Sequence, residues 1–320
     1  MQLNHSTAEI NGLQMHYVTA GEGPAIILCH GFPETWYSWR KQIGALAEAG
    51  FKVIVPDLRG FGDSAGPAEP DRSTSFDVMG DLLKLMDHLG AEKAGICGHD
   101  WGATIAWSAA LLRPDRFAAV AALSVPLTPR GQNSLPGLLK LSAPPSIYML
   151  YFLEPGVAEK ELDADARTFL RRIFYTNSGN LAEGMQPNMF VAETGRLTDS
   201  LYEPHEPLPW LTEGDLDVYE DAFRKSGFRG ALNTYRSLHR SWELMAGWDD
   251  LKVEVPALYV GGTRDVVLSF PGMKEAVEMM TTFAPLAEAP IMLEGIGHWI
   301  QHEAPERTNE ALIEFFRRVL

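Results

Sequence analysis

Six short runs of apolar residues, many of them branched, recur along the chain and predict buried β-strands. They span residues 25–29, 52–55, 94–97, 118–124, 257–260 and 290–293. Between most of these runs the apolar positions follow a helical period, as in residues 76–89, where Val78, Leu82 and Leu85 fall on one side. Strands that alternate with helices form a mostly parallel sheet with helices on both faces. The pattern therefore predicts an α/β fold.

This alternation breaks between about residues 127 and 247. The segment opens with five prolines between positions 126 and 145, continues as amphipathic helices rich in aromatic residues, and contains no clear strand. We expect a helical lid, residues 128–247, inserted between two strands of one core formed by residues 1–127 and 248–320. Such an insertion would lie above the carboxyl ends of the strands, where open α/β sheets bind ligands.

Composition and charge narrow the class of protein. The chain has 320 residues, 46% of them hydrophobic and 22% charged, which is typical of a globular protein. A net charge of -15 disfavours nucleic acid or an anionic membrane as a partner. Cys29 and Cys97 lie inside apolar runs, as core residues of a protein in a reducing compartment do. There is no run of 18 apolar residues and no basic-then-apolar start, so we expect a cytoplasmic protein without a membrane segment.

Residues 98–102, Gly-His-Asp-Trp-Gly, have the layout of a nucleophile elbow with Asp100 in the position of the usual serine. The elbow is a sharp turn from strand to helix, and glycines on its flanks relieve backbone crowding. A serine that attacked a saturated carbon would be left as an ether, which water does not readily cleave. An aspartate would be left as an ester, which water can hydrolyse. Asp100 therefore indicates attack at a saturated carbon.

Two further residues complete a candidate catalytic set. Asp265 follows the strand predicted at 257–260, and His298 follows the strand predicted at 290–293. The order nucleophile, acid, histidine is that of α/β-hydrolase triads, in which the histidine activates water. Asp249 and Asp250 are rivals for the acid, but they precede the strand, and residues 124–126 supply no carboxylate.

A loop at residues 30–33, His-Gly-Phe-Pro, follows the first buried strand and predicts an oxyanion hole. The backbone N–H groups of Phe32 and Trp101 would stabilise the oxyanion formed during ester hydrolysis. His30 is expected to anchor this loop, and Glu34 to line an entrance or to pack in the core. His298 and His302 have the spacing of metal ligands on a helix, but the motif offers no third ligand, so no metal is expected.

The chain resembles the soluble epoxide hydrolases of the α/β-hydrolase superfamily. The resemblance covers essentially the whole chain and rests on the motifs at residues 30–40, 98–102 and 297–299 and on the phrase at residues 150–159. The last is the most specific, because it lies in the lid. The resemblance implies a cofactor-independent hydrolase acting on ether bonds, which converts a small hydrophobic epoxide and water to a vicinal diol.

The same resemblance implies two lid tyrosines whose phenols hydrogen-bond the epoxide oxygen. By local motif these are Tyr148 and Tyr235, with Tyr151 and Tyr175 as competitors for the first position. Ring opening leaves an alkoxide, which needs a donor with a pKa near about 10 to stabilise or protonate it.

Two other functions stay open. A haloalkane dehalogenase shares the fold and the aspartate; Trp101 would suit a halide, but many members carry asparagine where this chain has Phe32. A non-catalytic ligand-binding protein on the same fold would usually have lost part of the triad, which is complete here. The sequence does not specify the natural epoxide, the stereochemistry, or whether the protein is a monomer or a homodimer.

Overall fold

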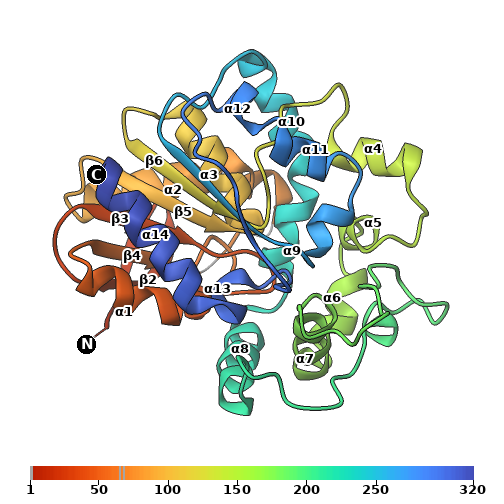
Figure 1. Ribbon diagram of the computed structural model, residues 1–320. Coiled ribbons are helices and arrows are strands. Elements are labelled where there is room, and N and C mark those ends of the chain that lie inside the picture. Colours follow the sequence, from red (N-terminus) through yellow and green to blue (C-terminus); the bar gives the residue numbers. More distant parts are fainter. Residues whose placement is uncertain (1–2, 65, 68) are drawn as a thin grey trace.

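The computed structural model of the chain describes residues 3–64, 66–67 and 69–320. These residues form one eight-stranded sheet in the order β1-β2-β4-β3-β5-β6-β7-β8 (Figure 1). The strands are β1 (Asn4–Ile10), β2 (Leu13–Ala20), β3 (Ala25–Cys29), β4 (Lys52–Pro56), β5 (Ala94–His99), β6 (Phe117–Leu123), β7 (Ala257–Gly262) and β8 (Ile291–Leu293). All neighbouring pairs from β4 to β8 are parallel. The predicted mostly parallel α/β fold is confirmed, and the six predicted strands are β3 to β8.

The antiparallel hairpin of β1 and β2 was not predicted. Near the turn, β1 alternates between buried and exposed positions, with Ala8 and Ile10 buried and Glu9 exposed, whereas the middle of β2 is continuously buried. The turn is Asn11-Gly12, and both residues have positive φ, of 49° and 78°. Asn-Gly is the favoured pair for such a two-residue turn. The sequence therefore contains a hairpin signal, but it lies in the Asn-Gly turn and in the alternating pattern of β1, and not in a continuous apolar run.

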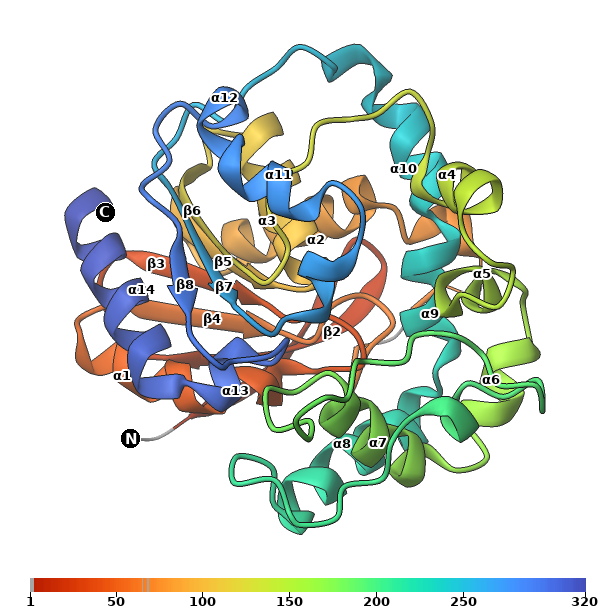
Figure 2. The ribbon, with the colours of Figure 1, turned by 45° about the vertical axis from the view of Figure 1, so that its right-hand side comes forward.

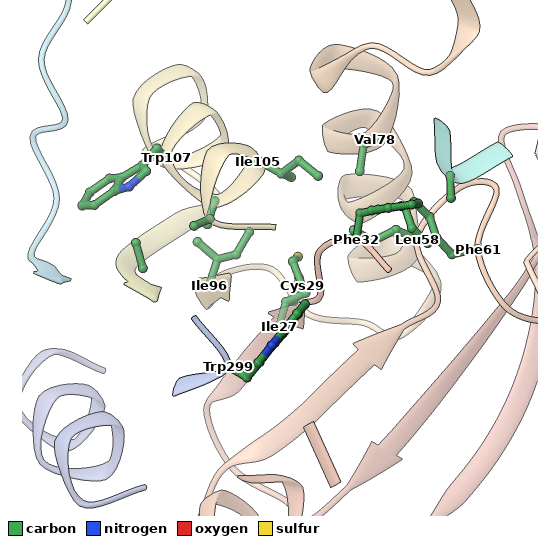
Figure 3. Close-up of a cluster of buried hydrophobic side chains, with 14 of the residues drawn as sticks. Ile27, Cys29, Phe32, Leu58, Phe61, Val78, Ile96, Ile105, Trp107 and Trp299 are labelled. Atoms are coloured by element: carbon green, nitrogen blue, oxygen red, sulfur yellow. The ribbon is translucent and has the colours of Figure 1, made fainter. Parts of the chain in front are cut away.

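Helices cover both faces of the sheet (Figure 1). On one face α1 (Arg40–Glu48) and α14 (Pro305–Val319) pack against the strands through residues such as Ile43, Leu46 and Phe316. On the other face α2 (Ser75–His88) and α3 (Trp101–Leu112) pack over a larger cluster, part of which is drawn in Figure 3. The smaller elements of the core are η1 (Trp36–Trp39), η2 (Pro70–Arg72), η5 (Val266–Ser269), α11 (Met273–Glu278), α12 (Met280–Phe283) and α13 (Ile300–Glu303).

Helical structure fills the chain between β6 and β7, in the segment 128–247 that we call the lid. Its elements are α4 (Leu135–Ser142), α5 (Tyr148–Leu153), α6 (Val157–Leu162), α7 (Ala166–Thr176), η3 (Thr198–Ser200), α8 (Glu213–Ser226), α9 (Arg229–Arg236), α10 (Leu238–Leu244) and η4 (Met245–Trp248). Its β-structure is one isolated bridge, between Ile147 and Phe190. Figure 2 shows these helices beside the sheet. The boundaries at 127 and 247 stay a prediction.

Polar contacts attach the lid to the core. Arg40, at the start of α1, pairs through Nε with Asp215 of α8 at 3.0 Å, and its guanidinium also donates to the Trp210 carbonyl. The Tyr37 hydroxyl donates to Asp215 at 2.9 Å. The lid and core also share one buried apolar cluster, in which Phe32 of the core meets lid aromatics. Among the described residues, no helix is both long and apolar enough to cross a membrane.

Candidate active site

Asp100 occupies a strained turn between β5 and α3. Its φ of 54° and ψ of -121° lie outside the regions that ordinary residues prefer. A Cβ at Gly98 would overlap the carbonyl oxygen of Gly102, and a Cβ at Gly102 would overlap that of Cys29. The two glycines are therefore required by the close passage of the backbone, and the turn presents the Asp100 carboxylate at the carboxyl end of the sheet.

Main-chain N–H groups stabilise that carboxylate. The N–H of Phe32 donates to Asp100 Oδ1 at 2.8 Å, and the N–H of Trp101 also stabilises the charged form. Gly31 must be glycine, because a Cβ there would overlap Asp100. Burial raises the pKa of Asp100, and His298, His99 and the two N–H groups offset this only in part. Both predicted oxyanion-hole residues thus lie at the predicted nucleophile.

His298 lies between the two carboxylates of the predicted set. Its Nε2 is 3.7 Å from Asp100 Oδ2, and its Nδ1 is 3.0 Å from Asp265 Oδ1. Asp265 comes after β7 and caps η5, accepting from the Val267 N–H at 2.9 Å. The rival Asp249 instead pairs with Arg130 on the surface. The structure therefore brings together Asp100, His298 and Asp265.

The charges of this set are strongly coupled. Burial by itself would lower the pKa of His298, but Asp265, through its charge and its hydrogen bond, and then the charges of Asp100 and Glu34, raise it to about 9. Burial by itself would raise the pKa of Asp265, yet His298 and hydrogen-bond donors bring it below its usual value. Asp265 is therefore ionised at neutral pH and can stabilise a protonated His298.

Ser124 is a member of this site that the sequence did not predict. The strand expected to end at residue 124 ends at Leu123, and the Ser124 hydroxyl lies 3.0 Å from His298 Nδ1. Residues 124–126 supply no carboxylate, and a serine hydroxyl carries no comparable sequence signal for a place beside the base.

Glu34 lies beneath the site and not at an entrance. Its side chain is fully buried, and it pairs with His99 Nδ1 at 2.7 Å and approaches His302 Nε2 at 3.4 Å. Burial would raise the pKa of Glu34, but these two histidines hold it well below the usual value. His99 Nε2 in turn lies 2.8 Å from the main-chain oxygen of His298. A buried charge network thus supports the loops that carry both the oxyanion hole and the base.

Two other histidines have structural partners. His30 accepts from the Leu58 N–H at 3.0 Å and so ties the oxyanion loop to the loop after β4, as predicted. His302 contacts Arg40 and Glu34, and burial lowers the pKa of His302 to about 4. In the described part of the chain, no group of three His, Cys, Asp or Glu residues is arranged to hold a metal ion.

The two predicted lid tyrosines face the elbow. Tyr148 begins α5 and Tyr235 lies in α9, and their ring centroids are 6.1 Å apart. Tyr235 packs on both oxyanion-hole residues, with centroids 5.5 Å from Phe32 and 5.0 Å from Trp101. Burial, followed for Tyr148 by the charge of Asp100, raises the pKa of both phenols, so both are protonated at neutral pH.

The competing tyrosines have other surroundings. The Tyr151 hydroxyl donates to Glu161 at 2.6 Å, inside the lid. Tyr175 is buried in α7, where its carbonyl accepts from Ser178. The charge of Asp100 contributes to the raised pKa of both Tyr148 and Tyr235.

Comparisons with known proteins agree with this geometry. A family model for the alpha/beta hydrolase fold matches residues 24–305. Epoxide hydrolase A of Mycobacterium tuberculosis is 40% identical over 312 residues, covering 96% of this chain and 95% of that protein. Epoxide hydrolase 2 of Siraitia grosvenorii is 37% identical over 323 residues, with 99% of each chain covered.

Solved structures give the same result. An epoxide hydrolase from an endophytic Streptomyces has a TM-score of 0.92 and 39% identity, covering 98% of this chain and 95% of that one. Potato (Solanum tuberosum) epoxide hydrolase I has a TM-score of 0.91 and 35% identity, covering 99% of this chain and all of that one, 100%.

Proposed function

Because this chain belongs to the α/β hydrolase fold family and, within it, to the epoxide hydrolases, we propose that it converts an epoxide to a vicinal diol through an ester formed on Asp100. The observation that carries the proposal is the 2.8 Å hydrogen bond from the Phe32 N–H to Asp100 Oδ1. This contact supports a role in which Oδ1 takes the oxyanion position and Oδ2 attacks carbon.

In the first step Asp100 Oδ2 attacks a ring carbon and the C–O bond of the epoxide breaks. Tyr148 and Tyr235 hydrogen-bond the epoxide oxygen, and one of them gives it a proton. The raised pKa values of the phenols support this role, because a donor must be protonated at working pH. The product is a hydroxyalkyl ester of Asp100.

In the second step neutral His298 takes a proton from water, which attacks the ester carbon of Asp100. The negative charge develops on Oδ1, where the N–H groups of Phe32 and Trp101 stabilise it. The bond between Asp100 Cγ and Oδ2 then breaks, and His298 gives its proton to the departing alkoxide. The acid proton left on Asp100 returns to the tyrosine that was deprotonated in the first step, which restores the Asp100 carboxylate. Asp265 holds His298 in the tautomer with the proton on Nδ1 and stabilises the imidazolium.

A single turnover in heavy-oxygen water tests the covalent step. Because the oxygen added to the substrate is Asp100 Oδ2, the first diol should be unlabelled, and label should enter the protein carboxylate and then later diols. Label in every first-turnover diol would contradict the ester.

Replacement of the base gives a second test. The variant His298→Gln should still form the ester on Asp100 but should not hydrolyse it. The intact mass of the protein should then increase by the mass of the epoxide. Asp100→Ala is the control and should show no increase. Release of halide from a 1-haloalkane, without any diol from an epoxide panel, would instead identify a dehalogenase.

We also propose that the substrate is a small hydrophobic epoxide and that the protein works in the cytoplasm as a monomer or homodimer. The net charge of -15 supports a role away from nucleic acids and anionic membranes. Cell fractionation and light scattering on the purified protein test location and oligomeric state.

A further inference from the structure

Ser124 has an unusual backbone conformation. The non-glycine residues with positive φ in the described part of the chain are Asn11, Ser124 and Asp100. Asn11 lies in a hairpin turn that favours asparagine, and Asp100 is the proposed nucleophile. Ser124 has a φ of 73°, and the Val125 N–H donates to the Leu123 carbonyl across it at 2.9 Å. A three-residue turn of this hand is rare and strained. Such strain persists where the surroundings enforce it, which is typical of functional sites.

The strand that leads to Asp265 enforces this conformation. The Ser124 N–H donates to the Val260 carbonyl at 3.0 Å, and the Tyr259 hydroxyl donates to the Ser124 carbonyl at 2.8 Å. Both partners lie in β7, and Asp265 follows three residues after that strand ends. Ser124 is also fully buried. Its position is therefore fixed relative to the acid of the proposed set, and not merely to the end of β6.

The side chain then contacts the base. His298 Nδ1 has two oxygens at 3.0 Å, Asp265 Oδ1 and Ser124 Oγ. In the tautomer that can accept a proton from water at Nε2, Nδ1 carries the hydrogen and donates it. A serine hydroxyl can both accept and donate. Its lone pair can face the Nδ1 hydrogen while its own hydrogen points to the Asp265 carboxylate. Burial would raise the pKa of Asp265, and His298 first and then the hydrogen bond from Ser124 lower it.

We propose that Ser124 is a positioning residue for ester hydrolysis: its hydroxyl, aimed by the strained turn, holds His298 and Asp265 in the orientation and tautomer that activate water. The inference rests on the proposed two-step function. The inference goes beyond that function because it adds Ser124, as a residue that orients His298, to the set of Asp100, His298 and Asp265. Ser124 acts through His298, which serves the second step, so its loss should slow decay of the ester and not its formation.

Two variants separate the hydroxyl from the backbone strain. Ser124→Ala removes the hydroxyl at an unchanged strained φ, whereas Ser124→Gly removes it and relieves the strain, because glycine adopts positive φ readily. Rapid mixing with epoxide, followed by intact mass, measures ester formation and ester decay separately. Ser108→Ala is the control, since that hydroxyl bonds a carbonyl of its own helix, α3, at 2.9 Å.

We expect both variants to slow ester decay by about tenfold or more, the effect of losing a hydrogen bond to a charged group. Ester formation should stay within about twofold of the unchanged enzyme, as should both steps in the control. The Nδ1 proton resonance of His298, identified by its loss in His298→Gln, should move in both variants. A purely structural role would not move it.

Decay at the original rate in Ser124→Gly would overturn the inference, because the hydroxyl would then be dispensable. Equal slowing of ester formation and ester decay would also overturn the inference, because a general loss of structure slows both steps. These results differ from failure of the proposed function, which would appear as no ester in the unchanged enzyme or in His298→Gln.

Discussion

At the scale of single residues, the site changes its own electrostatics during the proposed reaction. His298 has a pKa near 9 in part because the Asp100 carboxylate lies 3.7 Å away. Once Asp100 is esterified, its charge is gone, and an imidazole that loses a nearby anion becomes less basic. Formation of the ester therefore favours the neutral His298 that the second step needs.

The variant Asp100→Asn tests this coupling, because its side-chain amide is neutral, like the ester, and is nearly isosteric with the carboxylate. Anions raise the pKa of an imidazole, so removal of one should lower the pKa of His298 from about 9. Histidine NMR titration of both proteins measures the change, and intact mass confirms that the amide persists. An unchanged or higher pKa would show that the charge of Asp100 does not raise the basicity of His298.

The two lid phenols give a second residue-scale prediction. Tyr235→Phe should slow ester formation by about a hundredfold, the lower end of the range for a lost general acid, and should leave ester decay nearly unchanged. Tyr151→Phe is the matched control, since its hydroxyl is bound to Glu161. Single-turnover mass measurements resolve the two steps. A Tyr235 variant that slowed only decay would contradict the assigned role.

The residues of the site differ in how readily their roles can be predicted from the sequence. Asp100, Asp265 and His298 could be predicted because each follows a strand end, and parallel strands bring those ends to one edge. The roles of Ser124 and Glu34 depend on a positive φ and on burial beneath a loop, with partners far away in the chain. Neither property is encoded in a local motif, so these two residues required the structure.

At the scale of elements, the elbow depends on backbone contact. Gly102→Ala should cost about 3 kcal/mol or more, or abolish folding, because the added Cβ meets the main chain of Cys29, which cannot move aside. Gly44→Ala is the control: its Cβ would meet nothing within 4 Å, and the helix α1 should gain about 0.5–1 kcal/mol. Chemical denaturation measures both. Equal changes in the free energy of unfolding of the two variants would show that the structure around Gly102 adjusts to accept the added Cβ.

The elements were predictable where their residues form a continuous apolar run. Strands β3 to β7 are almost wholly buried and read as such runs. The hairpin was missed because the apolar positions of β1 alternate with polar ones, and those of β2 are interrupted by Gln14, His16 and Thr19. Helix α2 was predicted within one residue at each end from the helical period of its apolar positions. In the structure the Thr74–Asp77 capping box fixes its start.

At the scale of the whole molecule, Arg40 contributes to attachment of the lid. Arg40→Met keeps the apolar stem but removes the ion pair with Asp215, the bond to the Trp210 carbonyl and the contact with His302. We expect the melting temperature to fall by about 2–4 °C and hydrogen exchange in α8 to rise, with that of α3 unchanged. Arg113→Met, which loses an exposed pair with Asp115, should have little effect. Faster exchange throughout the sheet would contradict a local attachment.

The insertion of the lid between β6 and β7 divides the proposed chemistry between two parts of the chain. The phenols that open the ring belong to the lid, whereas the water-activating base, its acid and the oxyanion hole belong to the core. The chain leaves and re-enters the core at neighbouring strands, joined where Leu123 pairs with Val260. Lids could thus be exchanged during evolution without altering the sheet. A descendant whose new lid lacked both tyrosines would lose epoxide opening yet keep the core groups that hydrolyse an ester on Asp100, so ring opening could change while ester hydrolysis stayed the same.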